Sequence, residues 1–470
     1  MNKSQIPDIL RPVTRTTMSN VDIFTSVLDP VNRTQNRVIF NLRQQGILNA
    51  GSRIIMSVHP DATATPGDAF LPVGVGIAAC IDTAILRAGT RVLATSEQFG
   101  TYYFARRGVH TKSQKQNIDM PLDGGCNNVG NSPNVDGKFA VDVGSAIYTN
   151  STTCTVPAKY KPVTDQDDCP LYSLALSDLF PMMDSLQIPL FAMEVVVSVE
   201  LILKQQANPD TGKTMLFKNA PTSSKTQYGL NNFQLHLDYL QYDDATMNSV
   251  RNMVYSNSGM PFIYDDLSVT TTSIPAVTQP TVGTVTNADV IREVGSAGLK
   301  VKNVVVCEKN AAANTLFGDY RSDSPVHPPE FNWRYNNRIV YPRKLFNTSF
   351  MRNEVEHVMK FPFSVPNAVY SHDVSNQFYQ SNDGRQNELM DNAVEFEKQP
   401  CVAFAGTNFV TALNLEKGPQ GEGTEILHKN ILYERRQIFS RNDFSKRDIK
   451  FFTEYERSFL LRNGVLIVSA

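Results

Sequence analysis

The sequence predicts an all-β protein built from two sandwich domains, and three observations support this. The chain has 470 residues, which is too long for one ordinary core and suits two domains of about 200 residues each. Short segments in which apolar and polar residues alternate recur along the chain, as half-buried strands require. Turn residues come about every ten positions and helical patterns are few, which is typical of β-sandwiches.

The clearest strand pattern covers residues 194–204, where valines and leucines alternate with polar residues. Residues 233–239 alternate in the same way. The same reasoning predicts further strands at 37–43, 53–58, 82–87, 91–94, 215–217, 299–307, 338–341, 409–415 and 465–469. Ala88-Gly89 and Asn463-Gly464 stand between paired runs and are predicted to be hairpin turns.

Three short helices are predicted, at residues 99–107, at 174–183 and after Asp243-Asp244. Thr95 and Gln98 form a capping-box pattern before the first of them. The helix after Asp244 falls slightly past the midpoint of the chain, so it makes the best boundary between the two domains. Long surface loops are expected where composition turns polar or rich in Gly, Pro and Thr, at 119–137, 268–287 and 373–399.

Charge and hydropathy exclude several classes of protein. The net charge is -2, from 44 basic and 46 acidic residues. Proteins that coat nucleic acid need a strong basic excess, so direct genome packaging by this chain is not expected. The first 20 residues contain no apolar core of a secretory signal. The longest apolar stretch, residues 71–86, is too short and too interrupted to span a bilayer, so a soluble chain is expected.

Six cysteines occur, and no two of them form a CxxC pair. Their spacing matches no zinc module, which favours free thiols in a reducing compartment. A Cys126–Cys154 or a Cys154–Cys169 disulfide bond stays open as an alternative.

Two glycine-containing segments invite a phosphate-loop interpretation. Gly212-Lys213-Thr214 lacks the first glycine of that motif, because Ala207 holds its position. The residues that follow read as a strand, so a hairpin turn is predicted. Gly418, Gly421 and Gly423 lack the strand-to-helix context of a dinucleotide site and are predicted to form a flexible loop.

Acidic and histidine residues also give no catalytic pattern. His357 has no second histidine at the spacing of a zinc protease motif, and residues 165–168 form only half of a calcium loop, where a structural ion stays open. Asp243-Asp244 and Asp265-Asp266 are neighbours, and on a strand such pairs face opposite sides. We therefore predict no catalytic, cofactor-binding or metal-binding residue, no cofactor and no enzymatic activity.

Three segments in a fixed order carry a resemblance to a known family. Residues 82–107 (DTAILRAGTRVL, then an aromatic helix), residues 174–203 and residues 233–248 (FQLHLDYLQYDDATMN) follow one another at characteristic spacing. In this order they resemble the first domain of the major capsid proteins of nucleocytoplasmic large DNA viruses and related smaller double-stranded DNA viruses. Residues 333–338 and the terminal strand at 464–470 are similar to elements of the second domain.

The resemblance implies a double jelly roll, which is two consecutive eight-stranded jelly-roll sandwiches with a few short helices. It divides the chain into an N-terminal arm (1–25), a first roll with its linking helix (26–256) and a second roll (257–470). It also implies a structural shell protein whose homotrimers form pseudo-hexameric capsomers of an icosahedral virion. The loops at 119–161 and 268–289 would clasp neighbouring subunits.

The resemblance extends to partners and location. It implies contacts with neighbouring capsomers, with minor capsid and penton proteins and, through the arm that carries Arg11 and Arg15, with an internal membrane. It implies no sequence-specific binding of nucleic acid. The protein would be assembled in the host cell and located in the virion.

Two alternative functions stay open at this stage. A β-sandwich carbohydrate-binding protein or glycoside-active enzyme could use Trp333 and Tyr335 to stack on sugars. A penton or minor capsid protein would also be a β-sandwich, but such proteins usually carry one roll, and the second predicted domain counts against it.

Overall fold

The structure is a computed structural model, and it describes most of both halves of the chain. The described residues are 21–34, 36–60, 69–72, 75–108, 143–146, 171–204, 216–218, 224–226, 228–276, 286–310, 330–341, 358, 410–417, 421–439 and 446–469. The expected loops at 119–137 and 373–399 and the segments 165–168 and 212–214 lie outside these residues.

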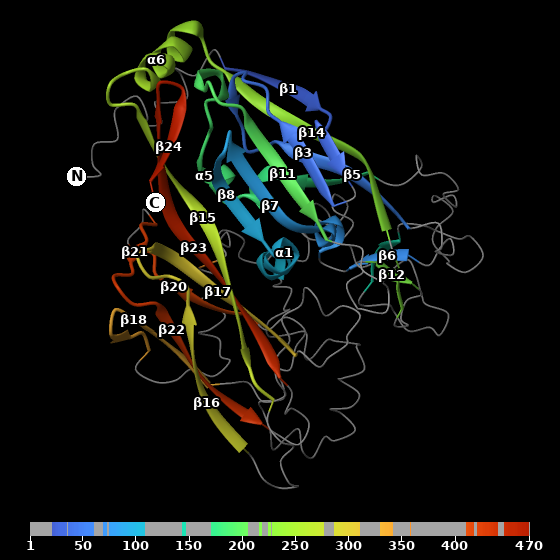
Figure 1. The fold of residues 1–470 in the computed structure, drawn as a ribbon, viewed down its shortest axis with the longest axis vertical. Coiled ribbons are helices and arrows are strands. Elements are labelled where there is room, and N and C mark those ends of the chain that lie inside the picture. Colours follow the sequence, from blue (N-terminus) through green and yellow to red (C-terminus); the bar gives the residue numbers. More distant parts are fainter. Residues whose placement is uncertain are drawn as a thin grey trace, which may run out of the picture.

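The first half of the chain forms two antiparallel sheets that pack face to face (Figure 1). Sheet 1A has the strand order β1-β14-β5-β10, with β4 beside β14, and sheet 1B has the order β2-β3-β11-β7-β8. Their strands are β1 (Asp22–Leu28), β2 (Asn32–Thr34), β3 (Arg37–Asn41), β4 (Ile47–Leu48), β5 (Arg53–Pro60), β7 (Ile81–Ala88), β8 (Arg91–Glu97), β10 (Leu171–Ala175), β11 (Val197–Leu203) and β14 (Tyr228–Gln241).

The second half forms another pair of antiparallel sheets. Sheet 2A has the order β15-β23-β17-β20, with β21 beside β17 and β24 beside β23, and sheet 2B has the order β16-β22-β18-β19. Their strands are β15 (Met260–Ile274), β16 (Thr286–Val294), β17 (Lys300–Asn310), β18 (Glu330–Tyr335), β19 (Arg338–Ile339), β20 (Val410–Asn414), β21 (Thr424–Glu425), β22 (Ile431–Phe439), β23 (Arg447–Arg462) and β24 (Val465–Ser469).

The two halves repeat one topology. The two sheets of each half contain eight main strands when the short strands β2, β4, β21 and β24 are left out. If these eight are numbered in chain order, one sheet has the order 1-8-3-6 and the other has the order 2-7-4-5, and this holds for both halves. This is the arrangement of a jelly roll, in which the chain winds between two facing sheets. The predicted all-β double jelly roll is therefore confirmed.

The remaining elements are short. A small sheet joins β6, β9, β12 and β13, and helix α6 links the two rolls at the top of Figure 1. These elements are β6 (Ala69–Pro72), β9 (Val143–Ala146), β12 (Leu216–Lys218), β13 (Ser224–Thr226), η2 (Gly76–Cys80), α1 (Phe99–Gly108), α4 (Leu176–Leu179), α5 (Met182–Ser185), η5 (Leu190–Ala192) and α6 (Asp244–Val254).

Local sequence explains the ends of several elements. Asp243 is the N-cap of α6, and its carboxylate accepts a hydrogen bond from the Thr246 amide at 3.1 Å. Asn463 and Gly464 both have positive φ, 50° and 70°, as a tight hairpin turn between β23 and β24 requires. The predicted cap of α6 and this predicted turn are both confirmed.

Three predictions about local structure are wrong. The segment 268–287 is not a single loop, because its residues 268–274 belong to β15 and β16 begins at Thr286. Thr95 does not cap α1, because it lies inside β8, and the strand turns into the helix at Gln98, where φ is 52°. The helix expected at 174–183 is two separate turns, α4 and α5. Strand β1 begins at Asp22, inside the range expected for the N-terminal arm.

Each roll has an apolar core between its sheets. The core of the second roll surrounds Trp333, Tyr433 and Phe451, all fully buried. The core of the first roll is larger and continues into the upper ends of β15 and β23, where Phe262 and Phe459 stack with their ring centroids 4.7 Å apart. The first core therefore includes residues from both halves of the chain, which joins the two rolls.

Candidate functional site

The contact between the two rolls is a candidate site, and two edge strands take part in it. Strand β8 of sheet 1B lies against β15 of sheet 2A (Figure 1). The buried Tyr264 hydroxyl donates to the Leu93 carbonyl at 2.7 Å. Arg457 donates to the same carbonyl at 3.4 Å and to the buried Asp266 carboxylate at 2.9 Å. A tyrosine and an arginine of the second roll thus bind one backbone carbonyl of the first.

Helix α1 of the first roll covers the outer face of sheet 2A. The Tyr102 ring lies 5.3 Å from the Phe452 ring, measured between centroids. Ala105 joins the same cluster, whose other buried members are Leu267, Val305, Cys307, Val358, Val410 and Ala412, and the partly buried Val269 packs against it. Because this face is apolar and lies outside the sandwich core, α1 removes it from solvent and makes it a second interior layer.

The upper end of the junction is held mainly by backbone hydrogen bonds. The Glu194 amide donates to the Gly464 carbonyl at 2.9 Å, and the Asn463 amide donates to the Val254 carbonyl at 3.0 Å. Arg91 reaches across from β8 and donates to the Leu466 carbonyl at 2.7 Å. These bonds fix the relative position of the rolls at three separate points.

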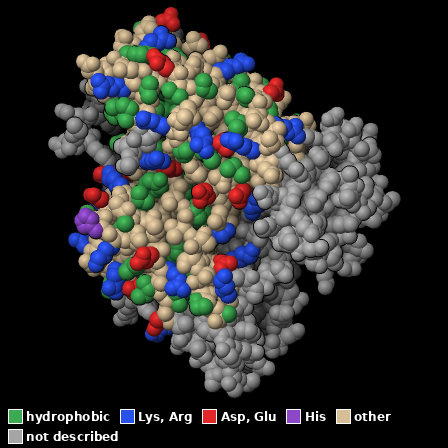
Figure 2. All heavy atoms as spheres, in the orientation of Figure 1, with side chains coloured by type: hydrophobic (Ala, Val, Ile, Leu, Met, Phe, Trp, Pro, Cys, Tyr) green, Lys and Arg blue, Asp and Glu red, His purple; other side chains and the backbone are tan. Residues whose placement is uncertain are grey.

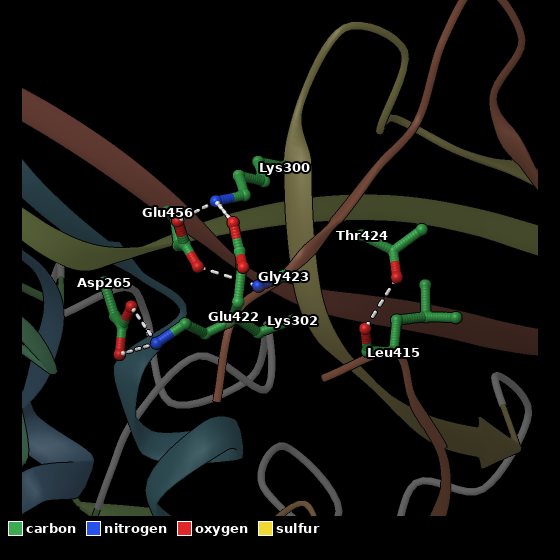
Figure 3. A network of polar contacts seen from close by, with 8 residues as sticks. All are labelled: Asp265, Lys300, Lys302, Leu415, Glu422, Gly423, Thr424 and Glu456. Carbon is green, nitrogen blue, oxygen red and sulfur yellow. Dashed lines mark hydrogen bonds and ion pairs between the residues drawn. The ribbon is translucent and has the colours of Figure 1, made fainter. Parts of the chain in front are cut away.

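Charged side chains on sheet 2A form a network of ion pairs (Figure 3). Lys300 binds Glu456 at 2.7 Å and Glu422 at 2.8 Å, and Lys302 binds Asp265 at 2.6 Å. Glu456 also accepts a hydrogen bond from the Gly423 amide at 2.7 Å. Each carboxylate is thus held by a cation, which favours a structural role over acid–base chemistry.

Gly423 shows why glycine occupies the loop before β21. A Cβ atom there would lie 2.8 Å from the Lys300 carbonyl oxygen, so a larger residue would push the loop off β17. Gly421 and Gly423 both lie in a loop, as predicted, and the Gly423 amide joins the end of this loop to Glu456 of sheet 2A. Gly418 lies outside the described residues.

A buried charge cluster crosses the core of the second roll. Glu308 on β17 accepts two hydrogen bonds from Arg435 on β22, at 2.6 and 2.9 Å, so one carboxylate joins sheets 2A and 2B. Arg447 also lies 3.5 Å from this carboxylate. The exposed fractions of the three side chains are 0%, 0% and 2%. Buried charges of this kind are tolerated when they are paired and hydrogen-bonded.

Glu200 is a buried carboxylate of the first roll, and it is paired within one sheet. On β11 it pairs with Arg37 at 2.7 Å and with Arg87 at 3.0 Å, on the strands to either side. Burial opposes its ionisation, but the hydrogen bonds from the two guanidinium groups outweigh burial and hold the pKa of Glu200 below its ordinary value.

Replacing Glu200 by glutamine is expected to lower the free energy of unfolding by about 1–2 kcal/mol near neutral pH. Because the folded pKa is lowered, this contribution is present above the unfolded pKa, near 4.5, and is lost as the pH falls through the folded value. Urea unfolding of both proteins across this range should show a difference that is full near neutral pH and shrinks in acid. A difference independent of pH would contradict this account.

The two described cysteines are buried. Neither Cys80 nor Cys307 is part of a disulfide bond, and burial raises the pKa of Cys307 to about 12. The predicted thiol state is confirmed for these two residues. Cys126, Cys154 and Cys169 lie outside the described part of the chain, so the alternative disulfide bonds stay untested.

Other residues considered from the sequence have structural positions. Asp265 and Asp266 point to opposite sides of β15, as predicted, since the first binds Lys302 and the second Arg457. His236 lies on β14, and its Nε2 atom is 3.3 Å from the Oε1 atom of Gln234 on the same strand. Within the described ranges, no group of three His, Cys, Asp or Glu residues is placed to hold a metal ion. None of the described helices is long and apolar enough to cross a membrane.

Trp333 does not offer a sugar-stacking surface. It is fully buried in the second core, with its ring centroid 4.7 Å from that of Tyr433. Tyr335 is partly buried and packs against the same core. The feature that supported the carbohydrate alternative is thus a feature of core packing.

Sequence reasoning missed the residues that join the rolls and those that cross the second core. Tyr264 lies 171 positions from Leu93, and Glu308 lies 127 positions from Arg435. The one available signal was their residue type, since charged and hydroxyl-bearing residues stand inside apolar strand segments at these positions.

Comparison with known proteins gives no match to the sequence and many to the structure. No family model matches the chain, and no curated protein matches it. Among solved structures, PBCV-1 VP54 fitted into the virophage Sputnik is similar over 98% of this chain and 99% of its own, with a TM-score of 0.57 and 10% identity.

Two further structures extend the comparison to other viruses. The Sputnik virophage structure is similar over 98% of this chain and 91% of its own, with a TM-score of 0.55 and 11% identity. The Faustovirus major capsid protein is similar over 94% and 90%, with a TM-score of 0.50 and 9% identity. At these identities the likeness concerns the fold. Together with the repeated strand order, it establishes that this chain has the double jelly-roll fold.

Proposed function

We propose that the chain is the major capsid protein of an icosahedral double-stranded DNA virus, a structural and non-enzymatic part of the virion shell. The observation that carries the proposal is the end-to-end likeness in fold to the PBCV-1 and Faustovirus capsid proteins. The likeness includes both rolls and their connection, because it spans nearly the whole length of each chain.

A chain with two fused rolls suits this role because of the symmetry that it allows. Three chains would bring six rolls around one axis, which gives a pseudo-hexagonal capsomer able to tile a large closed shell. Such a building block must be rigid. The buried junction at Tyr264, the α1 cover over Phe452 and the backbone bonds at Gly464 support a fixed angle between the rolls.

The proposed organisation follows from this role. Residues 1–25 contain an arm that precedes β1 at Asp22, residues 26–256 belong to the first roll with its linking helix, and residues 257–470 form the second roll. The partners are neighbouring capsomers and minor capsid and penton proteins, and the arm could reach an internal membrane. The location is the virion, after assembly in the host cell.

No sequence-specific binding of nucleic acid is proposed. The net charge of the chain is -2. The face seen in Figure 2 carries Lys and Arg side chains interspersed with Asp and Glu, without a continuous basic stripe. Direct binding of a genome requires such a basic surface.

The mass of the purified protein in solution tests this function. Light scattering is expected to give a stable trimer of 52.3 kDa chains, and negative-stain images should show particles with a hexagonal outline. A monomer over a wide range of concentrations would overturn the proposal. Turnover of a glycan substrate that disappears on replacing one Asp or Glu would overturn it in favour of an enzyme.

A further inference from the structure

The contact between the rolls joins two different edges, and the repeated topology leaves a second copy of each edge on the same chain. Within the chain, β8, the fifth main strand of the first roll, lies against β15, the first main strand of the second. The equivalent strands are β19, the fifth of the second roll, and β1, the first of the first roll. Among the described strands, β19 pairs with β18 alone and β1 with β14 alone.

The first of these edges carries exposed apolar side chains on its outer face. Ile23 and Val27 on β1 are 66% and 47% exposed. On the matching outer face of β15, Leu267 is only 5% exposed and belongs to a buried cluster that includes Tyr102 and Ala105 of α1. The same kind of face is therefore buried in one roll and open in the other.

The second edge has the features of its buried counterpart. β8 follows the turn Gly89-Thr90 and begins with Arg91, which donates to a backbone carbonyl of the second roll. β19 follows the turn Asn336-Asn337, with φ of 44° and 63°, and begins with Arg338, which is exposed. Its other residue, Ile339, is 56% exposed.

We propose that the β18–β19 hairpin of one copy docks on the β1 edge of a second copy, repeating between chains the contact that joins the rolls within a chain. Two dissimilar edges make a head-to-tail contact, and such contacts close into rings when the rotation between neighbours allows it. This inference rests on the proposed shell function and names the surfaces through which its capsomer closes.

Aspartate substitutions at the two edges test the contact. Val27→Asp and Ile339→Asp are each expected to weaken self-association at least tenfold, as read from light-scattering mass against concentration. Ile291→Asp is the matched control, since Ile291 is 57% exposed on β16, at the opposite edge of sheet 2B from β19. It should associate like the unmodified protein. If an aspartate variant misfolds, the milder changes Val27→Ser and Ile339→Ser at the same exposed positions test the contact by the same measurement of mass.

Mixing the two variants gives a sharper result. Each chain then keeps one intact edge, and the β19 edge of the Val27→Asp chain can dock on the β1 edge of the Ile339→Asp chain. The mixture is expected to form a complex of two chains that grows no further. A contact of β1 with β1, or of β19 with β19, would not give this result.

The outcomes separate this inference from the proposed function. An unmodified protein that is monomeric throughout overturns both. An unmodified trimer whose mass is unchanged by Val27→Asp and Ile339→Asp overturns the docking surfaces and leaves the shell function standing. Equal weakening by Ile291→Asp also overturns the assignment of the surfaces.

Discussion

Replacing Glu308 by alanine is expected to lower the free energy of unfolding by about 3–5 kcal/mol, because it leaves buried arginines without their shared carboxylate. Arg435 is fully buried and makes two hydrogen bonds to Glu308, and Arg447 is 2% exposed. For a domain of about 200 residues, a loss of this size lowers the melting temperature by on the order of 10 °C.

The single tryptophan of the chain makes this measurement local. Trp333 lies in the second core, where Tyr433 contacts both its ring and the Glu308 carboxylate. Its fluorescence during urea unfolding therefore reports the roll that contains the charge cluster. The expected result is a transition at lower urea concentration with the slope of the unmodified protein.

Glu422→Ala is the matched control for Glu308→Ala. Glu422 is also a glutamate paired with a cation near sheet 2A, but its side chain is 40% exposed. Exposed ion pairs contribute about 1 kcal/mol or less, so this variant should unfold almost like the unmodified protein. If both variants lose the same stability, or if Glu308→Ala loses less than about 1 kcal/mol, the account of the buried cluster is wrong.

Much of the first roll could be predicted from sequence because its strands are buried on one face. The alternation at 194–204 corresponds to β11, and that at 233–239 to the centre of β14. In β14, Leu235, Leu237 and Tyr239 face the core while the residues between them lie on the outer face of sheet 1A. When only one face of a strand is buried, apolar and polar residues alternate along its sequence with a period of two.

The long strands of the second roll escaped prediction for the opposite reason. Strands β15 and β23 pair along their whole lengths, from Met260–Leu461 to Ile274–Arg447. Parts of both faces of these strands are buried, one against the core and the other under α1. Residues 268–274 are rich in Ser and Thr, which suggests a loop, yet β-branched Thr suits a strand when a neighbour is present. Local sequence carries no signal for the pairing of two strands that lie more than 170 positions apart in the chain.

The site could be predicted less well than the fold. The sequence predicts that no catalytic group is present but not which residues join the rolls, because the partners meet only after both rolls have formed. The Asp243 cap of α6 was predictable since both of its members lie within one helical turn. The bond from Tyr264 to Leu93 depends on the tertiary packing of β8 against β15. Local sequence therefore predicts contacts within one helical turn or strand, but it does not predict the contacts between the two halves of the chain.

Truncating Trp333 to alanine is expected to cost about 3–5 kcal/mol of unfolding free energy, since it removes the largest buried side chain of the second core. Its ring lies 4.7 Å from Tyr433 and 6.5 Å from Phe451, measured between centroids, so the cavity would open between sheets 2A and 2B. Circular dichroism during thermal and urea unfolding measures the loss, because the fluorescence signal disappears with the residue.

Two companion variants identify the cause. Trp333→Phe keeps an aromatic ring in the core, and the indole N–H has no hydrogen-bond partner among the described residues, so this variant should lose clearly less stability than Trp333→Ala. Ile291→Ala removes an exposed side chain from the same roll and should change stability by about 0.5 kcal/mol or less. A Trp333→Ala protein that unfolds like the unmodified one but no longer binds a glycan would instead place Trp333 in a sugar site. That result would contradict its position between the two sheets.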